Sequence, residues 1–458
     1  MRRQQRQPPR AAVVPKLGQH NPAAAGLDIG AEEIWACVPA DRDAHPVRAC
    51  GTFTPDLPAL ADGLAQCQIT TVAMASTGVY WIPSSEILEA RGFEVSLVNA
   101  RQLKNVPGRK SAVQDCQWLP QVQSSGLRTA SFRPADDRRV LRTYVRPRAM
   151  LLEPRAGHIQ HRQKALQQMN VQLTQVLSAS TGTTGLQLSR AIVAGERDPQ
   201  VLARLRHGRC QRSEAELAKA LSGHYRPEHV FALKPALALS DFYTAQGHEC
   251  DTYIEQPYAA IKPVYEAQTP PAPLGPAPKP NAHAQNAPAF DVRAGWYRIL
   301  GFELTALAGL EASSVQVSVS EIGTDMSKWP TEKPFAAWLG VAPHNDISGG
   351  KVWRSQPLKG NRRAAQAVRW AAQTLGRPQT ALGSYYRRLR ARKGPAHAIT
   401  ATAHKLARIL SHILNPRTPY QPQSQETYEH HLRQRAIRHL KRTATRLGFT
   451  LLPQPVAA

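Results

Sequence analysis

The order of apolar and polar positions divides the chain into an alternating first part and a helical second part. Between residues 26 and 98, runs with a period of two predict strands at residues 26–38, 47–53, 69–74 and 93–98. A polar-apolar segment before residue 68 and a helical run over residues 80–92 separate them. This alternation is typical of a mixed α/β domain that ends near residue 130.

Beyond Arg133 the pattern becomes helical and polar. Residues 155–176 predict a long exposed helix rich in Gln, Arg and Lys, such as a helical arm or coiled coil. Because an interior proline costs a helix about 3 kcal/mol, Pro147 and Pro154 predict that this arm starts late or is kinked. A second helical region is expected over residues 214–261.

A proline-rich stretch then interrupts the helical pattern. Such a segment cannot form a helix or an inner strand, so it predicts an extended linker and a domain boundary. Its prolines are Pro270, Pro271, Pro273, Pro276, Pro278 and Pro280. A new unit is expected from Phe290, and residues 426–447 predict one more basic amphipathic helix to which the sequence assigns no role.

The charge of the chain indicates which class of partner it binds. Lys and Arg number 58 against 33 Asp and Glu, a formal net charge of +25, which argues against an ordinary neutral enzyme and favours a polyanion such as nucleic acid. No apolar run reaches the roughly 18 residues of a membrane span. The six cysteines are scattered without a close pair, which fits a reducing cytoplasm.

The basic residues gather in one part of the sequence. Residues 351–414 hold fourteen Lys or Arg and no acid. Within them, residues 384–393 combine five cations with Tyr385 and Tyr386, a mixture suited to neutralising phosphates and stacking on bases. The alternative is a merely solvated helix face.

Two acids stand out as candidates for chemistry. Asp28 lies in Gly-Leu-Asp-Ile-Gly within the first expected strand, and Asp115 follows a Gly-Arg-Lys loop at the start of an expected helix capped by Ser111. A strand-borne Asp is most often only a cap or surface residue. A two-metal phosphodiester site needs several carboxylates, and the pattern supplies two.

Several segments together resemble a known family, the DEDD-type insertion-sequence transposases, which are bridge-RNA-guided serine recombinases. The resemblance spans about residues 26–415 and rests on the segments Gly26–Gly30, Ala73–Trp81, Val98–Arg101, Val106–Ser111, Asp115–Trp118, Ala191–Pro199 and Ser320–Trp329. It implies a RuvC-like (RNase H-type) N-terminal domain, a helical coiled-coil arm and a mostly helical C-terminal transposase domain.

The pattern and the resemblance together give a domain organisation. It consists of a basic flexible arm (1–25), a RuvC-like domain (26–135), a helical or coiled-coil region (136–262), a proline-rich linker (263–289), a C-terminal transposase domain (290–415) and a basic tail (416–458).

The resemblance assigns four acids to a magnesium site, and this chain departs from that set. Asp28 and Asp115 match the first and fourth acids, whereas Ala75 and Ala112 stand where the second and third are expected. Losing two carboxylates removes two negative charges and their ligating oxygens, so we expect the Mg²⁺ site to be weakened or absent. The two alanines and the two helix-interrupting prolines predict an impaired copy.

The resemblance also implies a nucleophile, Ser348, in Asn-Asp-Ile-Ser-Gly-Gly-Lys. Its hydroxyl would attack a phosphodiester to form a phosphoserine link, with Gly349 and Gly350 allowing the DNA backbone to approach. From the residues alone, such a serine would be an ordinary loop residue. The cations expected to contact nucleic acid are Arg109, Lys110, Lys351, Arg354, Lys359, Arg362, Arg363, Arg387, Arg388, Arg390, Arg392 and Lys393.

The leading interpretation is therefore a DNA transposase of a mobile element, cytoplasmic and associated with the bacterial nucleoid. By resemblance its partners are the double-stranded DNA of the element ends and target, a guide RNA, and further copies of the chain in a dimer or tetramer. One alternative is a catalytically dead relic that only binds DNA or RNA. Another is a basic RNA-binding structural protein, which would explain the charge but not the contexts of Asp28 and Asp115.

Overall fold

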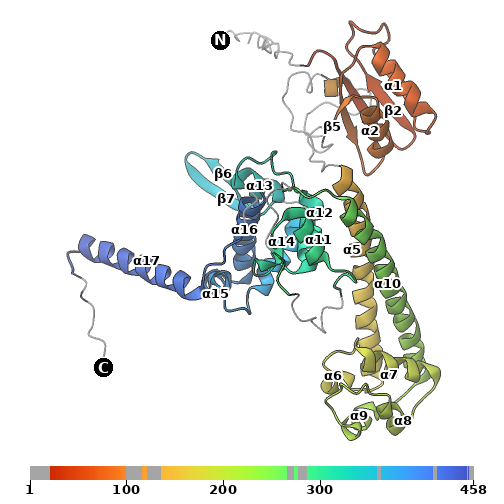
Figure 1. The fold of residues 1–458 in the computed structure, drawn as a ribbon, viewed down its shortest axis with the longest axis vertical. Helices are drawn as coiled ribbons and strands as arrows, with labels where there is room; N and C mark the ends of the chain where they lie inside the picture. Colours follow the sequence, from red (N-terminus) through yellow and green to blue (C-terminus); the bar gives the residue numbers. More distant parts are fainter. Residues whose placement is uncertain are drawn as a thin grey trace, which may run out of the picture. The chain divides into compact units, whose positions relative to one another are not determined.

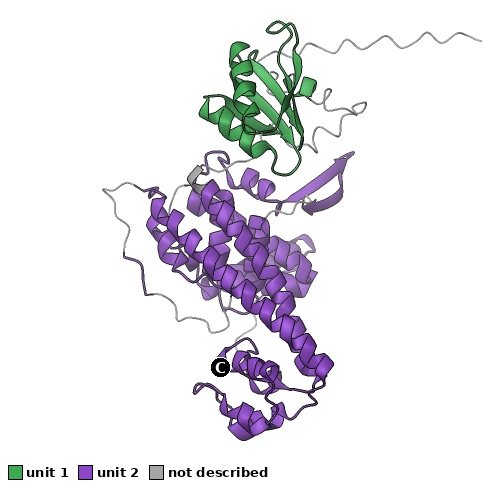
Figure 2. Cartoon of the chain, turned by 90° about the vertical axis from the view of Figure 1, so that its right-hand side faces the viewer, with its two compact units in different colours: residues 1–133 green, residues 134–458 purple. Residues whose placement is uncertain are grey.

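The computed structural model describes residues 21–98, 116–120, 136–265, 273–276, 286–357, 363–415, 420–450 and 452. The chain forms two compact units, residues 1–133 and 134–458 (Figure 2). None of the described helices is both long and apolar enough to cross a membrane.

The first unit is built on a five-stranded mixed sheet with the order β3-β2-β1-β4-β5 (Figure 1). β1 (Ala24–Ile29), β2 (Glu33–Cys37) and β3 (Val47–Gly51) are successive antiparallel strands. β4 (Thr71–Ser76) runs parallel to β1, and β5 (Glu94–Val98) runs parallel to β4. The single strand predicted over residues 26–38 is therefore wrong: a tight turn at residues 30–33 divides it into β1 and β2.

Two helices make the crossovers that parallel pairing requires. α1 (Asp56–Gln66) precedes β4, and α2 (Trp81–Ala90) precedes β5. α1 buries an apolar stripe with helical spacing, made of Leu57, Leu60, Ala61 and Leu64. This stripe joins residues of β1, β2 and β4 in one hydrophobic core. The expected mixed α/β N-terminal domain is thus confirmed.

The second unit contains two long helices that lie side by side, α5 (Asp136–Gln168) and α10 (Pro227–Ala260) (Figure 1). Between them the chain forms the tip module, which we define as residues 169–226. It holds α6 (Leu173–Val176), α7 (Thr183–Ala194), α8 (Pro199–Arg204) and α9 (Glu214–Leu221). The tip module has its own apolar core, which also takes in the adjoining ends of α5 and α10.

The helix α5 corrects one expectation about the prolines. It begins at Asp136 and includes both Pro147 and Pro154, so the prediction of a late start is wrong. Packing against α10 and bonds from arginines beside the prolines offset the lost backbone hydrogen bonds: Arg146 contacts Glu321, and Arg155 donates to Thr244 Oγ1 at 2.8 Å. The two prolines therefore give no sign of an impaired copy.

One ion pair between α5 and α10 is almost fully buried. Arg148 donates to both carboxylate oxygens of Asp251, whose side chain is 2% exposed, and Asp251 Oδ2 also accepts from the Ala289 amide at 3.0 Å. Arg148 further donates to the Asn286 carbonyl at 3.2 Å. Because the Arg148 and Asp251 side chains are both shielded from water, each depends on the other to compensate its charge.

Replacing Asp251 with Asn is therefore expected to lower the free energy of unfolding by about 3–5 kcal/mol, since it leaves the Arg148 charge buried and uncompensated. Urea unfolding of the full chain measures the change. Asp241→Asn is the matched control, because its ion pair with Arg190 is largely exposed and is worth about 1 kcal/mol or less. Equal effects of the two substitutions would contradict the prediction.

The rest of the second unit is a bundle of shorter helices and one hairpin. The helices are α11 (Val292–Leu300), η1 (Leu304–Ala306), α12 (Ala312–Ile322), α13 (Glu332–Leu339), α14 (Arg363–Thr374), α15 (Ala381–Lys393), α16 (Pro395–Leu414) and α17 (Gln425–Arg446). The hairpin pairs β6 (Pro343–Ser348) with β7 (Lys351–Pro357). The second unit is otherwise helical in its described part, as expected.

α12 connects this bundle to α5. Glu321 on α12 forms an ion pair with Arg142, whose Nε lies 2.9 Å from Oε2, and accepts hydrogen bonds from Arg146 at 2.8 and 2.9 Å. The described segments on either side of the proline-rich stretch therefore belong to one compact unit.

Candidate active site

Asp28 and Ala75 are direct neighbours in the sheet. β1 and β4 pair in parallel with Asp28 opposite Ala75, and the preceding pair on the same face is Gly26 opposite Ala73. Side chains of paired residues point to the same face of a sheet. An acid at position 75 would therefore lie beside the carboxylate of Asp28, which is where the family resemblance places its second acid.

The surroundings of Ala75 are apolar. Its side chain is 2% exposed and packs in a small cluster with Ala73, Val98 and Leu119, against which Trp118 lies. The side chains of this cluster offer no oxygen ligand, so among the described residues Asp28 supplies the carboxylate beside position 75.

The helical turn at residues 116–120 covers this face of the sheet at Gly26. A Cβ atom at Gly26 would lie 2.5 Å from the Cys116 carbonyl oxygen and 2.6 Å from Leu119 Cβ, so only glycine permits the approach. Cys116 also contacts β2, since a hydrogen bond with it lowers the pKa of the Cys37 thiol. The neighbouring candidates Arg109, Lys110, Ala112 and Asp115 lie outside the described residues.

Replacing Gly26 with Ala is accordingly expected to destabilise the first unit by about 1–3 kcal/mol, because the added methyl group must push back the turn at 116–120. Thermal or urea unfolding monitored by circular dichroism measures the loss. Gly63→Ala on α1 is the matched control: its new Cβ meets no atom within 4 Å, so stability should be unchanged or slightly higher. A Gly26→Ala chain as stable as the control would refute the close approach.

The donor set of the described residues does not fit a pair of Mg²⁺ ions. No group of three or more His, Cys, Asp or Glu within the described ranges is arranged to hold a metal ion. Magnesium prefers several oxygen ligands, and an alanine in an apolar cluster provides none.

Ser348 lies at the tip of the β6–β7 hairpin. It is the last residue of β6 and pairs with Lys351, the first residue of β7, across a two-residue turn. Gly349 and Gly350 have φ angles of 54° and 76°, the positive values that a tight type I′ turn requires at both positions. The glycines therefore fix the turn that presents Ser348, and its side chain is exposed.

Cations lie on the same hairpin as Ser348. Lys351 is directly opposite it, and Arg354 is opposite Asp346 in β6 and donates to Gln356 Oε1 at 3.0 Å. A bulge between residues 346 and 347 leaves Trp353 without a partner in β6, and its ring is 78% exposed. Trp353 is not among the residues predicted from the sequence, although a tryptophan directly before the candidate Arg354 signalled it. Lys359 and Arg362 lie outside the described residues.

The predicted basic helix is α15, and only some of its cations and tyrosines are exposed. Arg388, Arg390, Arg392 and Lys393 are exposed, as is Arg363 at the start of α14. Arg387 donates to the Pro378 carbonyl at 2.9 Å and so helps to hold the preceding turn. Tyr386 is 4% exposed, so the expectation that its ring stacks on a base is wrong: that ring belongs to the core.

Tyr385 takes part in a contact between three helices. Lys405 on α16 lies over the Tyr385 ring at 4.5 Å and over the Tyr428 ring of α17 at 5.4 Å. Burial lowers the pKa of Lys405, and the nearby charges of Arg388, Arg408 and Arg435 lower it further. Positive charge is therefore concentrated at the contact between α15, α16 and α17.

The segment Ala191–Pro199, one of the motifs behind the family resemblance, spans the end of α7, the turn after it and the first residue of α8. Gly195 ends α7 in the left-handed conformation, and Asp198 caps α8 by accepting from the Gln200 amide. Arg197 donates to the Ile192 carbonyl and lies over the Tyr225 ring at 5.1 Å. In the described structure this motif thus builds the tip module.

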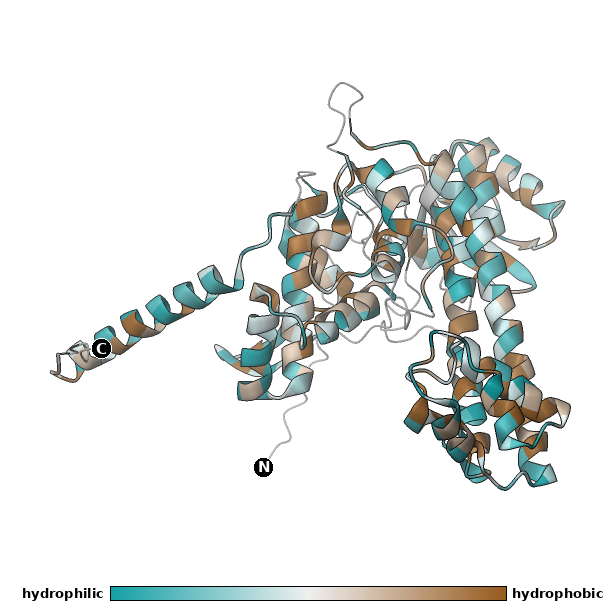
Figure 3. Ribbon diagram, turned by 60° about the horizontal axis from the view of Figure 1, so that its bottom comes forward, coloured by the Kyte–Doolittle hydropathy of each residue, from teal (hydrophilic) through white to brown (hydrophobic). Residues whose placement is uncertain are grey.

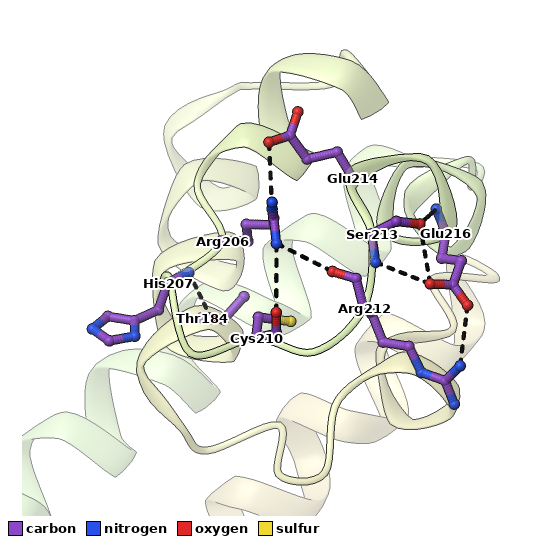
Figure 4. A network of polar contacts seen from close by, with 8 residues as sticks. All are labelled: Thr184, Arg206, His207, Cys210, Arg212, Ser213, Glu214 and Glu216. Carbon is purple, nitrogen blue, oxygen red and sulfur yellow. Dashed lines mark hydrogen bonds and ion pairs between the residues drawn. The ribbon is translucent and has the colours of Figure 1, made fainter.

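Two of the cations that follow this motif are paired with glutamates (Figure 4). Arg206 donates to Glu214 and to the carbonyls of Cys210 and Arg212, while the Arg212 side chain bonds Glu216 at 3.0 Å. Glu216 also completes a capping box with Ser213. These charges serve the local fold.

Asp28 and Ala75 belong to the first compact unit, whereas Ser348 and the basic helices belong to the second. The described structure brings Asp28 and position 75 together, and separately brings Ser348 and Lys351 together.

Comparison with known proteins assigns both units to one family. Residues 25–171 match the DEDD transposase model of the IS110 type, and residues 303–387 match the model described as Transposase IS116/IS110/IS902 family. No curated protein matches the sequence. The two matched segments follow each other in order and together cover about half of the chain. The chain therefore belongs to the IS110 family of transposases.

Proposed function

We propose that this transposase breaks and rejoins double-stranded DNA through a covalent link to Ser348, and that its acid site is impaired. The observation that carries the proposal is the register of the sheet, in which Asp28 stands directly beside an alanine where the family resemblance expects an acid. The strand order β3-β2-β1-β4-β5, with the first three strands antiparallel, supports a RuvC-like, RNase H-type fold for residues 26–135.

The chemistry at Ser348 follows from its position. The hydroxyl loses its proton as Oγ bonds to phosphorus, and one ester oxygen of the DNA strand leaves and takes up a proton. A serine at the exposed tip of a hairpin can reach a phosphate of a duplex without any part of the protein opening. The Lys351 ammonium, opposite Ser348, offsets charge that develops on the phosphate oxygens.

The family resemblance extends the proposal to partners. It implies a guide RNA, element ends as substrate, assembly into dimers or tetramers, and Mg²⁺ as the ion of the acid site. The ligands within this chain would be Asp28 and Asp115, with exposed cations of α14 and α15 contacting the DNA backbone.

The second candidate function is a catalytically dead relic that only binds nucleic acid. The burial of Ala75 in an apolar cluster favours it, because the missing acid has been replaced by packing.

Incubating the full chain with radiolabelled element ends and Mg²⁺ tests the proposal. A covalent protein–DNA adduct that maps to the peptide containing Ser348 is the expected result. If the chain binds DNA but forms no adduct, even after Ala75→Glu and Ala112→Asp restore both acids, the second candidate function is the correct one.

A further inference from the structure

The helix α17 is amphipathic, and none of its residues is buried. At 100° per residue, its apolar side chains share one face; they are Leu432, Ala436, Ile437, Leu440 and Ala444. The opposite face carries Arg435, Arg438, Lys441, Arg442 and Arg446. Figure 3 shows hydrophilic and hydrophobic patches along this helix, near the C-terminus of the chain.

Acidic residues are absent from the sequence of the basic part of α17. From His430 to Thr450 the sequence holds six Lys or Arg and no Asp or Glu. Within the described parts of the chain, none of these six side chains makes an ion pair or a hydrogen bond. They differ in this from Arg206 and Arg212 of the tip module, which bond neighbouring glutamates (Figure 4).

The first turn of α17 is docked, so the helix is not a loose tail. Glu429 accepts from Ser384 Oγ of α15 at 2.9 Å, and the Tyr428 ring lies against the Lys405 ammonium. Arg388 donates to the Tyr428 hydroxyl at 3.4 Å. Both acids of the helix, Glu426 and Glu429, lie at this docked end, and the basic part extends beyond it (Figure 1).

We propose that α17 is a further DNA-binding element, whose basic face lies along the phosphates of a duplex. It stands outside both segments that match the family models, which end at residues 171 and 387. The proposal rests on the proposed function only in taking double-stranded DNA as the polyanion.

The dimensions of the basic face suit this partner. Arg435 to Arg446 span about 16 Å along the helix axis, a length over which duplex DNA presents roughly ten phosphate charges. The docked turn places the helix next to α15. The exposed Arg390, Arg392 and Lys393 of α15 also have no acidic residue near them in the sequence. An anionic membrane surface is the competing partner for a basic amphipathic helix. DNA is favoured because Arg433 interrupts the apolar face, which holds no aromatic side chain to anchor it in a membrane, and because the chain is a transposase.

The test measures how DNA affinity depends on salt. The variant carries Arg435→Gln, Arg438→Gln, Lys441→Gln and Arg442→Gln, all substitutions to a good helix former. The control carries Arg204→Gln, Arg209→Gln, Lys219→Gln and Lys234→Gln, which remove the same charge from exposed cations elsewhere in the second unit. Fluorescence anisotropy with a 30-base-pair duplex gives the affinity of each full-length chain between about 0.05 and 0.3 M salt.

The slope of log K against log salt changes by about 0.9 for each phosphate contact. The magnitude of this slope is therefore expected to fall by about 3–4 in the α17 variant and by less than about 1 in the control. Equal slopes for parent and α17 variant would overturn the inference, as would an equal loss in the control. If the parent binds no DNA at all, the proposed function fails together with it.

Two further binding measurements distinguish DNA from other polyanionic partners. Parent and variant are compared on a duplex RNA of the same length and on vesicles containing phosphatidylserine. An effect of the α17 substitutions confined to RNA or to vesicles would overturn the assignment to DNA. Far-ultraviolet circular dichroism checks that helix content is unchanged in both variants.

Discussion

A chain carrying Ala75→Glu and Ala112→Asp is expected to form strand-transfer product at least a hundredfold faster than the native chain. The register of β1 and β4 explains the expected gain, because residue 75 lies directly opposite Asp28 and points to the same face. Two adjacent carboxylates repel each other unless a cation lies between them, so they favour Mg²⁺ binding. A hundredfold change in rate corresponds to about 2.7 kcal/mol in the barrier.

The same substitution should link stability to magnesium. Position 75 is almost fully buried among apolar side chains, so a charged Glu without a cation is expected to cost a few kcal/mol of folding free energy. Added Mg²⁺ should restore part of it and raise the Tm of the repaired chain, with little effect on the native chain. Differential scanning fluorimetry with and without Mg²⁺ measures this shift.

The matched control is Ala75→Gln with Ala112→Asn, which adds side chains of the same size without charge. This chain should show neither the gain in product nor the magnesium-dependent Tm. If the native and repaired chains give equal product, the metal-site argument is wrong.

The second large effect is expected from Ser348→Ala, which should abolish the covalent adduct and lower strand transfer by roughly a thousandfold or more in whichever chain is active. Only a nucleophile explains such a loss, because the serine is exposed at the end of a strand and its substitution should change stability by about 0.5 kcal/mol or less. Denaturing gels that retain protein-linked DNA measure the adduct.

Ser355→Ala on β7 is the control for this prediction, since Ser355 is an exposed serine of the same hairpin. Its activity should equal that of the parent, and DNA affinity should be unchanged in both variants. An adduct that persists in the Ser348→Ala chain would remove this residue as the nucleophile.

Local patterns predicted much of the first unit. The apolar stripe of α1, the continuous buried run of β4 and the alternation in β5 are readable because the core of an α/β unit imposes these patterns. The division of β1 from β2 was missed because both flanks of the tight turn are apolar. The proline-containing helix α5 was mispredicted since its stabilising contacts, such as Arg148 with Asp251, join residues far apart in the sequence.

Prediction of the candidate site from the sequence was limited in the same way. Position 75 could be matched to a missing acid by resemblance, but its pairing with Asp28 depends on strand register, which no single segment encodes. The residues around Ser348 predicted a loop, whereas the hairpin strands on either side of it were not predicted. The amphipathic pattern of α17 was visible, whereas its docking through Lys405 and two tyrosine rings required the folded bundle.

The pair of long helices also sets a length scale. From the contact of Arg146 with Glu321 to the end of α5 at Gln168, the helix rises about 33 Å, close to one turn of a DNA duplex. The tip module is therefore held about one duplex repeat away from the level of α12 by the paired helices. Lengthening α5 and α10 together by a few residues would rotate the tip module as well as displace it.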